Sequence, residues 1–183
     1  LQTNAGNDPA AVLAEAKQQL AKLTRDAPRE SYGMGRFDGI VQSPQNDPLT
    51  GALNRSGFNQ IVAASFAETR QSGRPVSLVV VAVEGIVESA RLRGTHHADD
   101  LVVSAVATLN THFEPLGGIV ARVGTASFAV VLPATERAIA ARVAEDMRRD
   151  VERSAPAWLA KRDGPSTAIS VAAGIASATP DTL

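Results

Sequence analysis

The residues best suited to chemistry stand in one short cluster, His96, His97, Asp99 and Asp100. Imidazole and carboxylate groups ligate metals and serve as general acids and bases. Adjacent helical residues point in different directions, so only His96 and Asp100, which are one turn apart, could share an ion. The simpler interpretation is a polar helix start, where the helix dipole favours the two aspartates. We therefore predict no metal site at this cluster.

Composition argues against several other kinds of site. The 183 residues include no cysteine, which excludes disulfides, thiolate metal sites and a cysteine nucleophile. The net charge of -1, without a polybasic stretch, argues against nucleic acid as a partner. No apolar run reaches the ~18–20 residues of a membrane span, so any membrane attachment is expected from segments outside this chain. We expect a cytoplasmic protein, or the cytoplasmic part of a membrane-anchored one.

The N-terminal part is expected to lie outside the main domain. Residues 1–27 should form an amphipathic helix that begins at Asp8-Pro9, an N-cap residue followed by proline. This helix either packs on its own domain or pairs with that of a second copy, and three turns leave both open. Residues 28–46, rich in Gly, Pro, Ser and Asn, should form an irregular linker. The apolar stripe of the helix comprises Val12, Leu13, Ala16, Leu20 and Leu23.

From residue 47 onward, helical and strand patterns alternate. The β-branched run at 76–83 is typical of a strand that is covered on both faces. In the last helix, Ile139, Val143 and Met147 are expected to point inward. The pattern predicts an α/β sandwich with a mixed, mainly antiparallel sheet. We expect helices at 54–71, 86–93, 97–113 and 135–154, and strands at 76–83, 119–123, 128–132 and 167–176, the middle two forming a hairpin.

The chain has several motifs in the order found in one family. The clearest is Asp47-Pro48-Leu49-Thr50-Gly51-Ala52-Leu53-Asn54-Arg55, which resembles the Asp-x-Leu-Thr-Gly-Leu-x-Asn-Arg opening motif of GGDEF domains. Residues 94–102 resemble the Gly-His-x-x-Gly-Asp segment, and residues 121–133 the Ala-Arg-Tyr-Gly-Gly-Asp-Glu-Phe signature hairpin. Residues 167–175 resemble the closing Thr-x-Ser-x-Gly-Ile strand. The resemblance implies a nucleotidyl-cyclase palm-like (ferredoxin-like) fold for residues 47–183, without the family's C-terminal helix.

The same resemblance implies an active site that has lost its metal ligands. The family joins two GTP molecules into cyclic di-GMP and holds divalent metals with carboxylates. The first-strand carboxylate falls on Ala82, and the second on Glu84, which keeps its charge. The acid that ends the signature motif falls on Ser127, and the acid before it on Ala126. A hydroxyl is a far weaker magnesium ligand than a carboxylate, so we expect no metal and no cofactor.

The positions that contact the nucleotide depart from the family pattern as well. The phosphate-facing lysine falls on Val87, and the guanine-reading asparagine on Ala90. Of the base-reading pair only the acid is kept, as Asp99. The small second glycine of the signature turn falls on Thr125, whose side chain would crowd the nucleotide.

The family's feedback site, Arg-x-x-Asp, falls on Pro115 and Gly118, so cyclic di-GMP binding by that route is not expected. The leading hypothesis is a catalytically inactive, degenerate GGDEF module of bacterial cyclic di-GMP signalling, with GTASF as its signature. It would act as a regulatory, dimerisation or protein-interaction domain of a larger protein. One alternative is a sensor that binds GTP or cyclic di-GMP through other contacts. Another is an enzyme with changed chemistry that uses Glu84, Asp99 and Asp100.

Overall fold

The computed structural model describes residues 45–159 and 168–182, and for residues 155–159 the backbone alone. The helix expected over residues 1–27 lies outside the described residues. The same holds for the linker expected over residues 28–46, apart from its last two positions.

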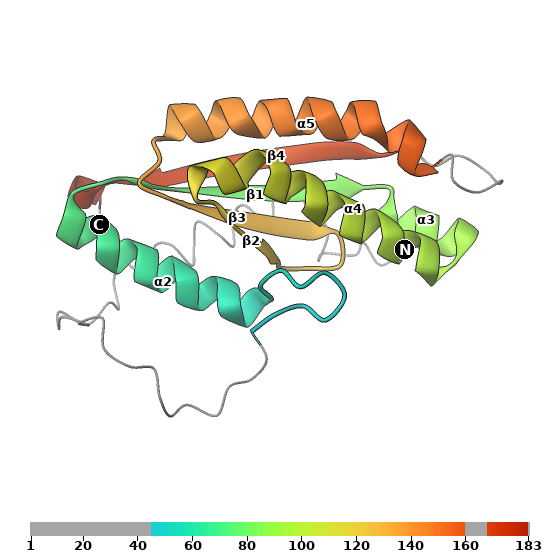
Figure 1. Ribbon diagram of the computed structural model, residues 1–183, viewed down its shortest axis with the longest axis horizontal. Helices are drawn as coiled ribbons and strands as arrows, with labels where there is room; N and C mark the ends of the chain where they lie inside the picture. The colour runs from blue at the N-terminus through green and yellow to red at the C-terminus, as the bar shows by residue number, and fades with distance from the viewer. Residues whose placement is uncertain (1–44, 160–167, 183) are drawn as a thin grey trace, which may run out of the picture.

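Four strands form one sheet in the order β2-β3-β1-β4 (Figure 1). They are β1 (Val76–Glu84), β2 (Ile119–Arg122), β3 (Ser127–Pro133) and β4 (Ser170–Ala178). Every pair of neighbouring strands is antiparallel. Within the described residues, the parallel part of the mixed sheet is limited to a single bridge between Leu53 and Ala121. The predicted α/β sandwich is confirmed.

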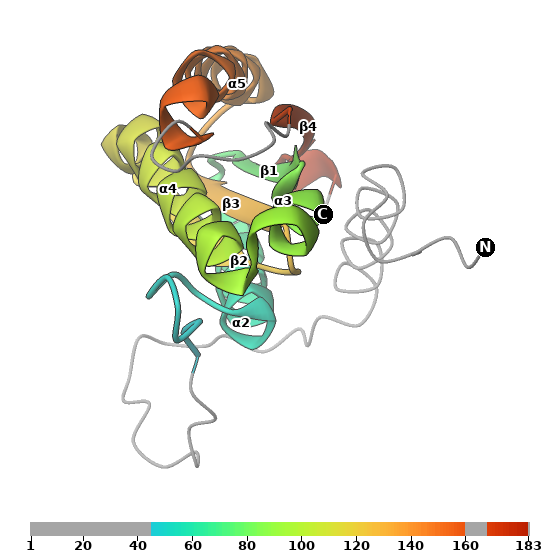
Figure 2. The same cartoon turned by 90° about the vertical axis from the view of Figure 1, so that its right-hand side faces the viewer.

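Helices cover both faces of this sheet. One face packs against α2 (Arg55–Ser72), and the other against α4 (Thr95–Phe113) and α5 (Arg137–Leu159). The short helix α3 (Ile86–Arg93) packs against α4. Figure 2 shows α4 and α5 together on one side of the sheet, away from α2. Two short 3-10 helices, η1 (Glu114–Leu116) and η2 (Pro180–Thr182), complete the described chain. No described helix has both the length and the apolar character needed to cross a membrane.

Strand β1 contributes side chains to two hydrophobic cores, one on each face of the sheet. All eight residues from Val76 to Val83 are buried, as expected for a strand that is covered on both faces. Val79, Val81 and Val83 point into the larger core with α3, α4 and α5. Leu78, on the alternate face, packs in the smaller core with Phe58, Val62 and Phe66 of α2.

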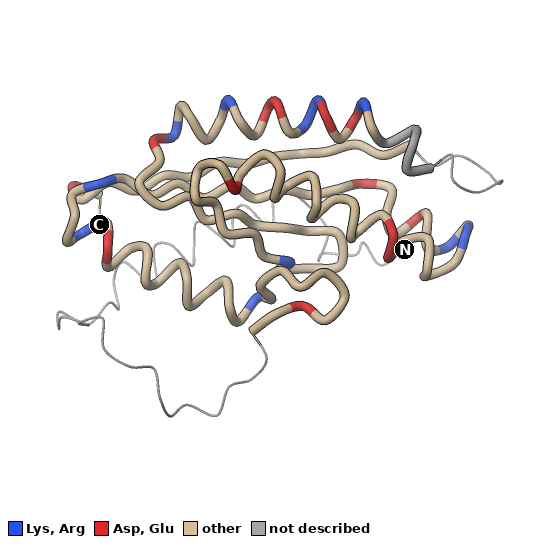
Figure 3. Tube along the Cα trace, in the orientation of Figure 1, with Lys and Arg blue, Asp and Glu red and all other residues tan. Residues whose placement is uncertain are grey.

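The inward face of α5 differs from the prediction. Met147 is fully buried and Val143 half-buried, but Ile139 is 39% exposed, so its predicted inward position is wrong. The buried stripe runs instead through Ala140, Ala144, Met147 and Val151. Alanines in the first turns let α5 approach β4 and α4 closely, which rotates the bulkier isoleucine outward. Acidic and basic residues occur together along α5 (Figure 3).

Candidate functional site

The opening motif folds into a turn that starts α2. The Asp47 carboxylate accepts hydrogen bonds from the Thr50 backbone N–H (3.0 Å) and from the Thr50 hydroxyl (2.8 Å). Gly51 follows with a φ of +73°, a left-handed conformation that favours glycine. Asn54 then caps α2 by accepting from the Gly57 N–H at 3.0 Å. The polar residues of the motif that form these bonds therefore build the turn and the helix start.

Arginines fasten this turn to the signature hairpin. Arg122 Nη1 lies 3.2 Å from Asp47 Oδ2, and its Nη2 donates to the Thr125 carbonyl at 3.2 Å. Arg55 donates from Nε and Nη2 to the Val123 carbonyl at 3.1 and 2.9 Å. Burial raises the pKa of the Asp47 carboxyl, but the hydrogen bonds from Thr50 and the charge of Arg122 outweigh it, so the pKa is lowered.

Ala82 and Ser127 lie opposite each other where the hairpin tip leads into β3. They are paired in the β1–β3 register, and Ala172 of β4 flanks Ala82 on its other side. Both are buried, with 6% of Ala82 and 3% of Ser127 exposed. The Ser127 hydroxyl has no hydrogen-bond partner among the described residues. This pair therefore forms a buried, nearly apolar surface, which we call the floor of the candidate site.

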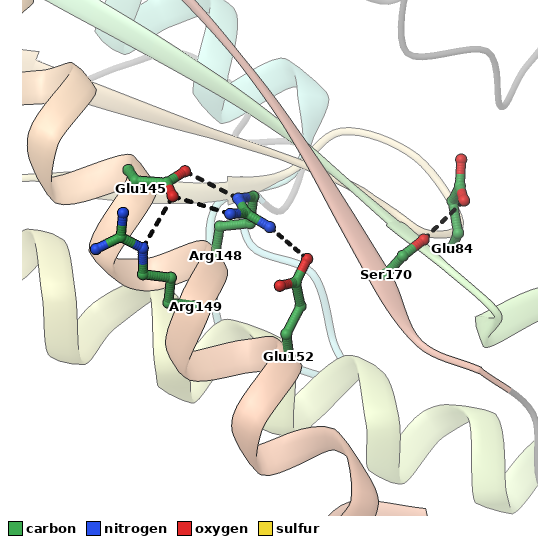
Figure 4. Close-up of polar contacts among 6 residues, drawn as sticks. All are labelled: Glu84, Glu145, Arg148, Arg149, Glu152 and Ser170. Carbon is green, nitrogen blue, oxygen red and sulfur yellow. Dashed lines mark hydrogen bonds and ion pairs between the residues drawn. The ribbon is translucent and has the colours of Figure 1, made fainter.

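Glu84 is the one acidic residue among the first-strand positions, and it is exposed at the end of β1. Its Oε2 accepts a hydrogen bond of 2.8 Å from the Ser170 hydroxyl on β4 (Figure 4). The two residues are register partners, which brings them together across 86 positions of sequence. Ser170 lies in the segment that resembles the family's closing strand, but that motif does not predict the contact, which only the register of the sheet reveals.

The chain that leads into β4 packs directly against the start of α3. Gly85 precedes the helix with a φ of +92°, and a Cβ there would clash with the Ala168 carbonyl. On α3 itself, Val87 is 38% exposed, whereas Ala90 packs against the larger core. Asp99 is half-buried in the first turns of α4. Two of the three positions at which the family resemblance implies nucleotide contacts thus carry hydrocarbon side chains.

Sequence reasoning also missed a buried polar group on α3. Ser89 is fully buried, and its hydroxyl has no hydrogen-bond partner among the described residues. The pattern could not have revealed it, because a serine that directly follows Glu88 and precedes Arg91 by two residues looks like a solvated position.

The hairpin tip and the feedback positions lie at opposite ends of β2. Thr125 is exposed at the tip, while Pro115 and Gly118 precede β2 at its far end. Gly118 has no room for a side chain, because a Cβ would lie 2.7 Å from the Phe113 carbonyl and 3.0 Å from Leu132. An aspartate could not occupy position 118 without displacing the backbone.

The residues present do not fit a catalytic metal. Within residues 45–159 and 168–182, no three His, Cys, Asp or Glu side chains come together as a metal site. His97 is buried, whereas His96 and Asp100 are exposed. The floor offers one hydroxyl, on Ser127, and Glu84 is bonded to Ser170. Magnesium prefers carboxylates in an octahedral arrangement, which these groups do not provide.

The densest charge cluster, on α5, is satisfied internally. Arg148 bonds Glu145 at 2.8 Å and Glu152 at 2.6 Å, and Arg149 bonds Glu145 at 2.9 Å (Figure 4). The hydrogen bond from Arg148 lowers the pKa of Glu145 to about 2. Because these side chains are 33–61% exposed and mutually paired, the cluster is a solvated helix face.

A family model described as diguanylate cyclase, GGDEF domain, matches residues 45–182, three quarters of the chain. The chain belongs to the GGDEF family. Comparison with curated protein sequences gives no match.

Solved GGDEF domains share the fold at low sequence identity. The GGDEF domain of DgcB from Caulobacter crescentus, solved in complex with c-di-GMP, has a TM-score of 0.67 and 22% identity over 78% of this chain and 82% of its own. The FimX GGDEF domain from Pseudomonas aeruginosa has a TM-score of 0.65 and 20% identity over 76% and 83%. Diguanylate cyclase SiaD from the same organism, solved with its activator SiaC, has a TM-score of 0.63 and 19% identity over 92% and 58%. These likenesses support the palm-like GGDEF fold.

Proposed function

We propose that this GGDEF domain makes no cyclic di-GMP and works as a regulatory or interaction module of cyclic di-GMP signalling. The observation that carries the proposal is the buried pair Ala82 and Ser127, which face each other where the family resemblance places metal-binding carboxylates. A methyl group and a hydroxyl cannot replace the two negative charges that hold divalent metals.

The remaining groups do not compensate for this loss. Joining two nucleotides requires a metal that neutralises the triphosphate, together with positive groups that stabilise the transition state. Val87 and Ala90 provide no charge or hydrogen bond, and the Glu84 carboxylate is engaged by Ser170. A single exposed carboxylate cannot assemble the metal site, so the proposal assigns the domain a role through contacts.

The test is incubation of the purified protein with GTP and either magnesium or manganese, with an active cyclase as the positive control. We expect no cyclic di-GMP above a no-protein control. Turnover that increases with the amount of protein and disappears in Glu84→Gln would refute the proposal. It would support an enzyme of changed chemistry instead.

A nucleotide sensor is the second candidate, favoured by the half-buried acid Asp99 at the family's base-reading position. Calorimetric titration with GTP and with cyclic di-GMP, each with and without magnesium, separates the candidates. We expect no binding at low micromolar ligand, and none at residues 115–118, where Gly118 admits no side chain. Binding that Asp99→Asn abolishes would identify a sensor.

The partner of such a module would be a protein or an attached domain. SiaD, which shares the fold, was solved with its activator SiaC. The net charge of -1 and the paired charges on α5 offer no basic surface for nucleic acid. We place the module in the cytoplasm, attached to a membrane only through segments outside this chain.

A further inference from the structure

The segment that enters the domain is paired directly with the strand leading to the hairpin tip. The Gln45 carbonyl accepts from the Asn54 N–H at 2.7 Å, which ties the incoming chain to the start of α2. Leu53 donates to the Val120 carbonyl at 3.1 Å, and its own carbonyl accepts from the Arg122 N–H at 2.7 Å. The incoming chain is thus connected to β2 through a series of backbone hydrogen bonds.

A side-chain link runs parallel to these backbone bonds. Arg122 bridges the Asp47 carboxylate, immediately after the incoming segment, and the Thr125 carbonyl at the tip. Only 18% of Arg122 and 16% of Asp47 is exposed, so water and salt screen this pair less than a surface pair. The Arg122 guanidinium therefore contacts both the Asp47 carboxylate and the Thr125 carbonyl.

The tip, residues 123–126, is held by other bonds as well. Arg55 at the start of α2 donates to the Val123 carbonyl from Nε at 3.1 Å and from Nη2 at 2.9 Å. The Val123 and Gly124 N–H groups both donate to the Ser127 carbonyl, at 2.9 and 3.1 Å. The Ala126 carbonyl accepts from the Val83 N–H at 2.9 Å, which connects the tip to the end of β1. Because Val83 directly follows Ala82, a displacement of the tip would be transmitted to the floor of the candidate site.

We propose that Asp47 and Arg122 form a coupling device through which the chain entering at residues 45–47 sets the position of the hairpin tip at residues 123–126. The device goes beyond the proposed function, since it serves a contact module and a nucleotide sensor equally. Coupling between two places in a protein is reciprocal, so a change at the tip must also be felt at the incoming chain.

Residue-resolved hydrogen exchange on the full chain tests the first direction. In Asp47→Asn we expect the Val123 and Gly124 amides to exchange about tenfold faster, because a hydrogen bond to a charged group contributes at least that factor. Asn46→Ala is the matched control. It removes the 3.1 Å hydrogen bond to the Gly51 carbonyl and loosens the opening turn without removing a side-chain bond of Asp47 or Arg122, so the tip amides should keep the parent rate. Arg122→Lys keeps the charge beside Asp47 but cannot bridge to Thr125, so only the tip should accelerate.

The reverse direction is tested with Thr125→Gly, which loosens the exposed tip. Exchange at the Gly51 and Asn54 amides should accelerate when Asp47 is present. Thr125→Gly should add no further acceleration when combined with Asp47→Asn. Unchanged tip exchange in Asp47→Asn would overturn the proposal. An equal acceleration at Val79 in the middle of β1 would overturn it as well, because the pair would then serve global stability alone.

Discussion

The methyl group of Ala82 and the hydroxyl of Ser127 meet across two strands with almost no access to water. Carboxylates at these positions would be buried charges beside each other, and such charges are costly without a cation. We expect the double variant Ala82→Asp, Ser127→Glu to lose about 1–3 kcal/mol of stability and to gain no cyclase activity. Thermal melts with and without magnesium measure this.

The matched control for that variant is Ser127→Ala. It removes a buried hydroxyl that has no partner among the described residues, so its stability should be unchanged or slightly raised. If the double variant melts like the parent without metal, or rises strongly with magnesium, an open metal-ready cleft exists. That result would favour a nucleotide sensor over a contact module as the function of this domain.

Asp47 predicts a specific dependence of stability on pH. Its pKa in the folded chain lies below the ordinary value of 3.8 because Thr50 and Arg122 outweigh the effect of burial. A lowered pKa stabilises the fold above the unfolded value, and this contribution is lost as pH falls through the folded value. We expect Asp47→Asn to cost about 1–3 kcal/mol at neutral pH. Urea unfolding should show the difference from the parent shrinking below about pH 4, and a constant difference would contradict this.

The motifs predicted where residues lie in the fold better than they predicted side-chain contacts. The resemblance placed Ala82, Ser127 and Glu84 on two adjacent strands, and the register agrees. The bond from Ser170 to Glu84 was missed because it depends on the alignment of β4 with β1. The bridge from Arg122 to Asp47 was missed for the same kind of reason, since 75 residues separate the two.

Among the elements, the junction between β1 and α3 is the most constrained. Gly85 has a φ of +92°, and a Cβ there would clash with the Ala168 backbone, whereas Gly73 at the end of α2 has a φ of +74° and open space around it. Gly73→Ala should therefore cost only the left-handed strain, about 1–2 kcal/mol. Gly85→Ala should cost about 1–3 kcal/mol more, because it also overpacks the chain leading into β4. Equal unfolding midpoints in urea for Gly73→Ala and Gly85→Ala would contradict this, because they would show that the chain leading into β4 can shift to accommodate the added Cβ.

Strong periodicity made the elements predictable, and small residues caused the main error. In the helix expected over residues 97–113, Leu101, Val102 and Leu109 recur at helical spacing, and all three are buried. On α5 the apolar pattern could be satisfied by two stripes one residue apart. Alanines provide the buried one, and Ile139 is left exposed. Hydrophobicity alone ranks isoleucine above alanine, so the sequence favoured the wrong stripe.

At the scale of the whole molecule, the two cores should unfold as one unit because β1 contributes to both. Assembly is a separate question, since the helix expected over residues 1–27 lies outside the described residues. We predict that this helix pairs two copies. Leu13→Glu with Leu20→Glu in the full chain should then shift the mass in solution from dimer to monomer, measured by light scattering. Gln18→Glu, which falls on the opposite face of the expected helix, is the control, and an unchanged mass in the leucine variant would contradict the pairing.

The closed floor at Ala82 and Ser127 has a thermodynamic consequence for the protein in a cell. A domain that binds metal and nucleotide gains stability with the logarithm of their concentrations, so its folded population follows the supply of GTP. Here the floor is filled by the chain's own side chains, and that dependence is absent under the proposed function. The abundance of the folded domain would then stay constant while nucleotide levels rise and fall, as a fixed docking platform requires.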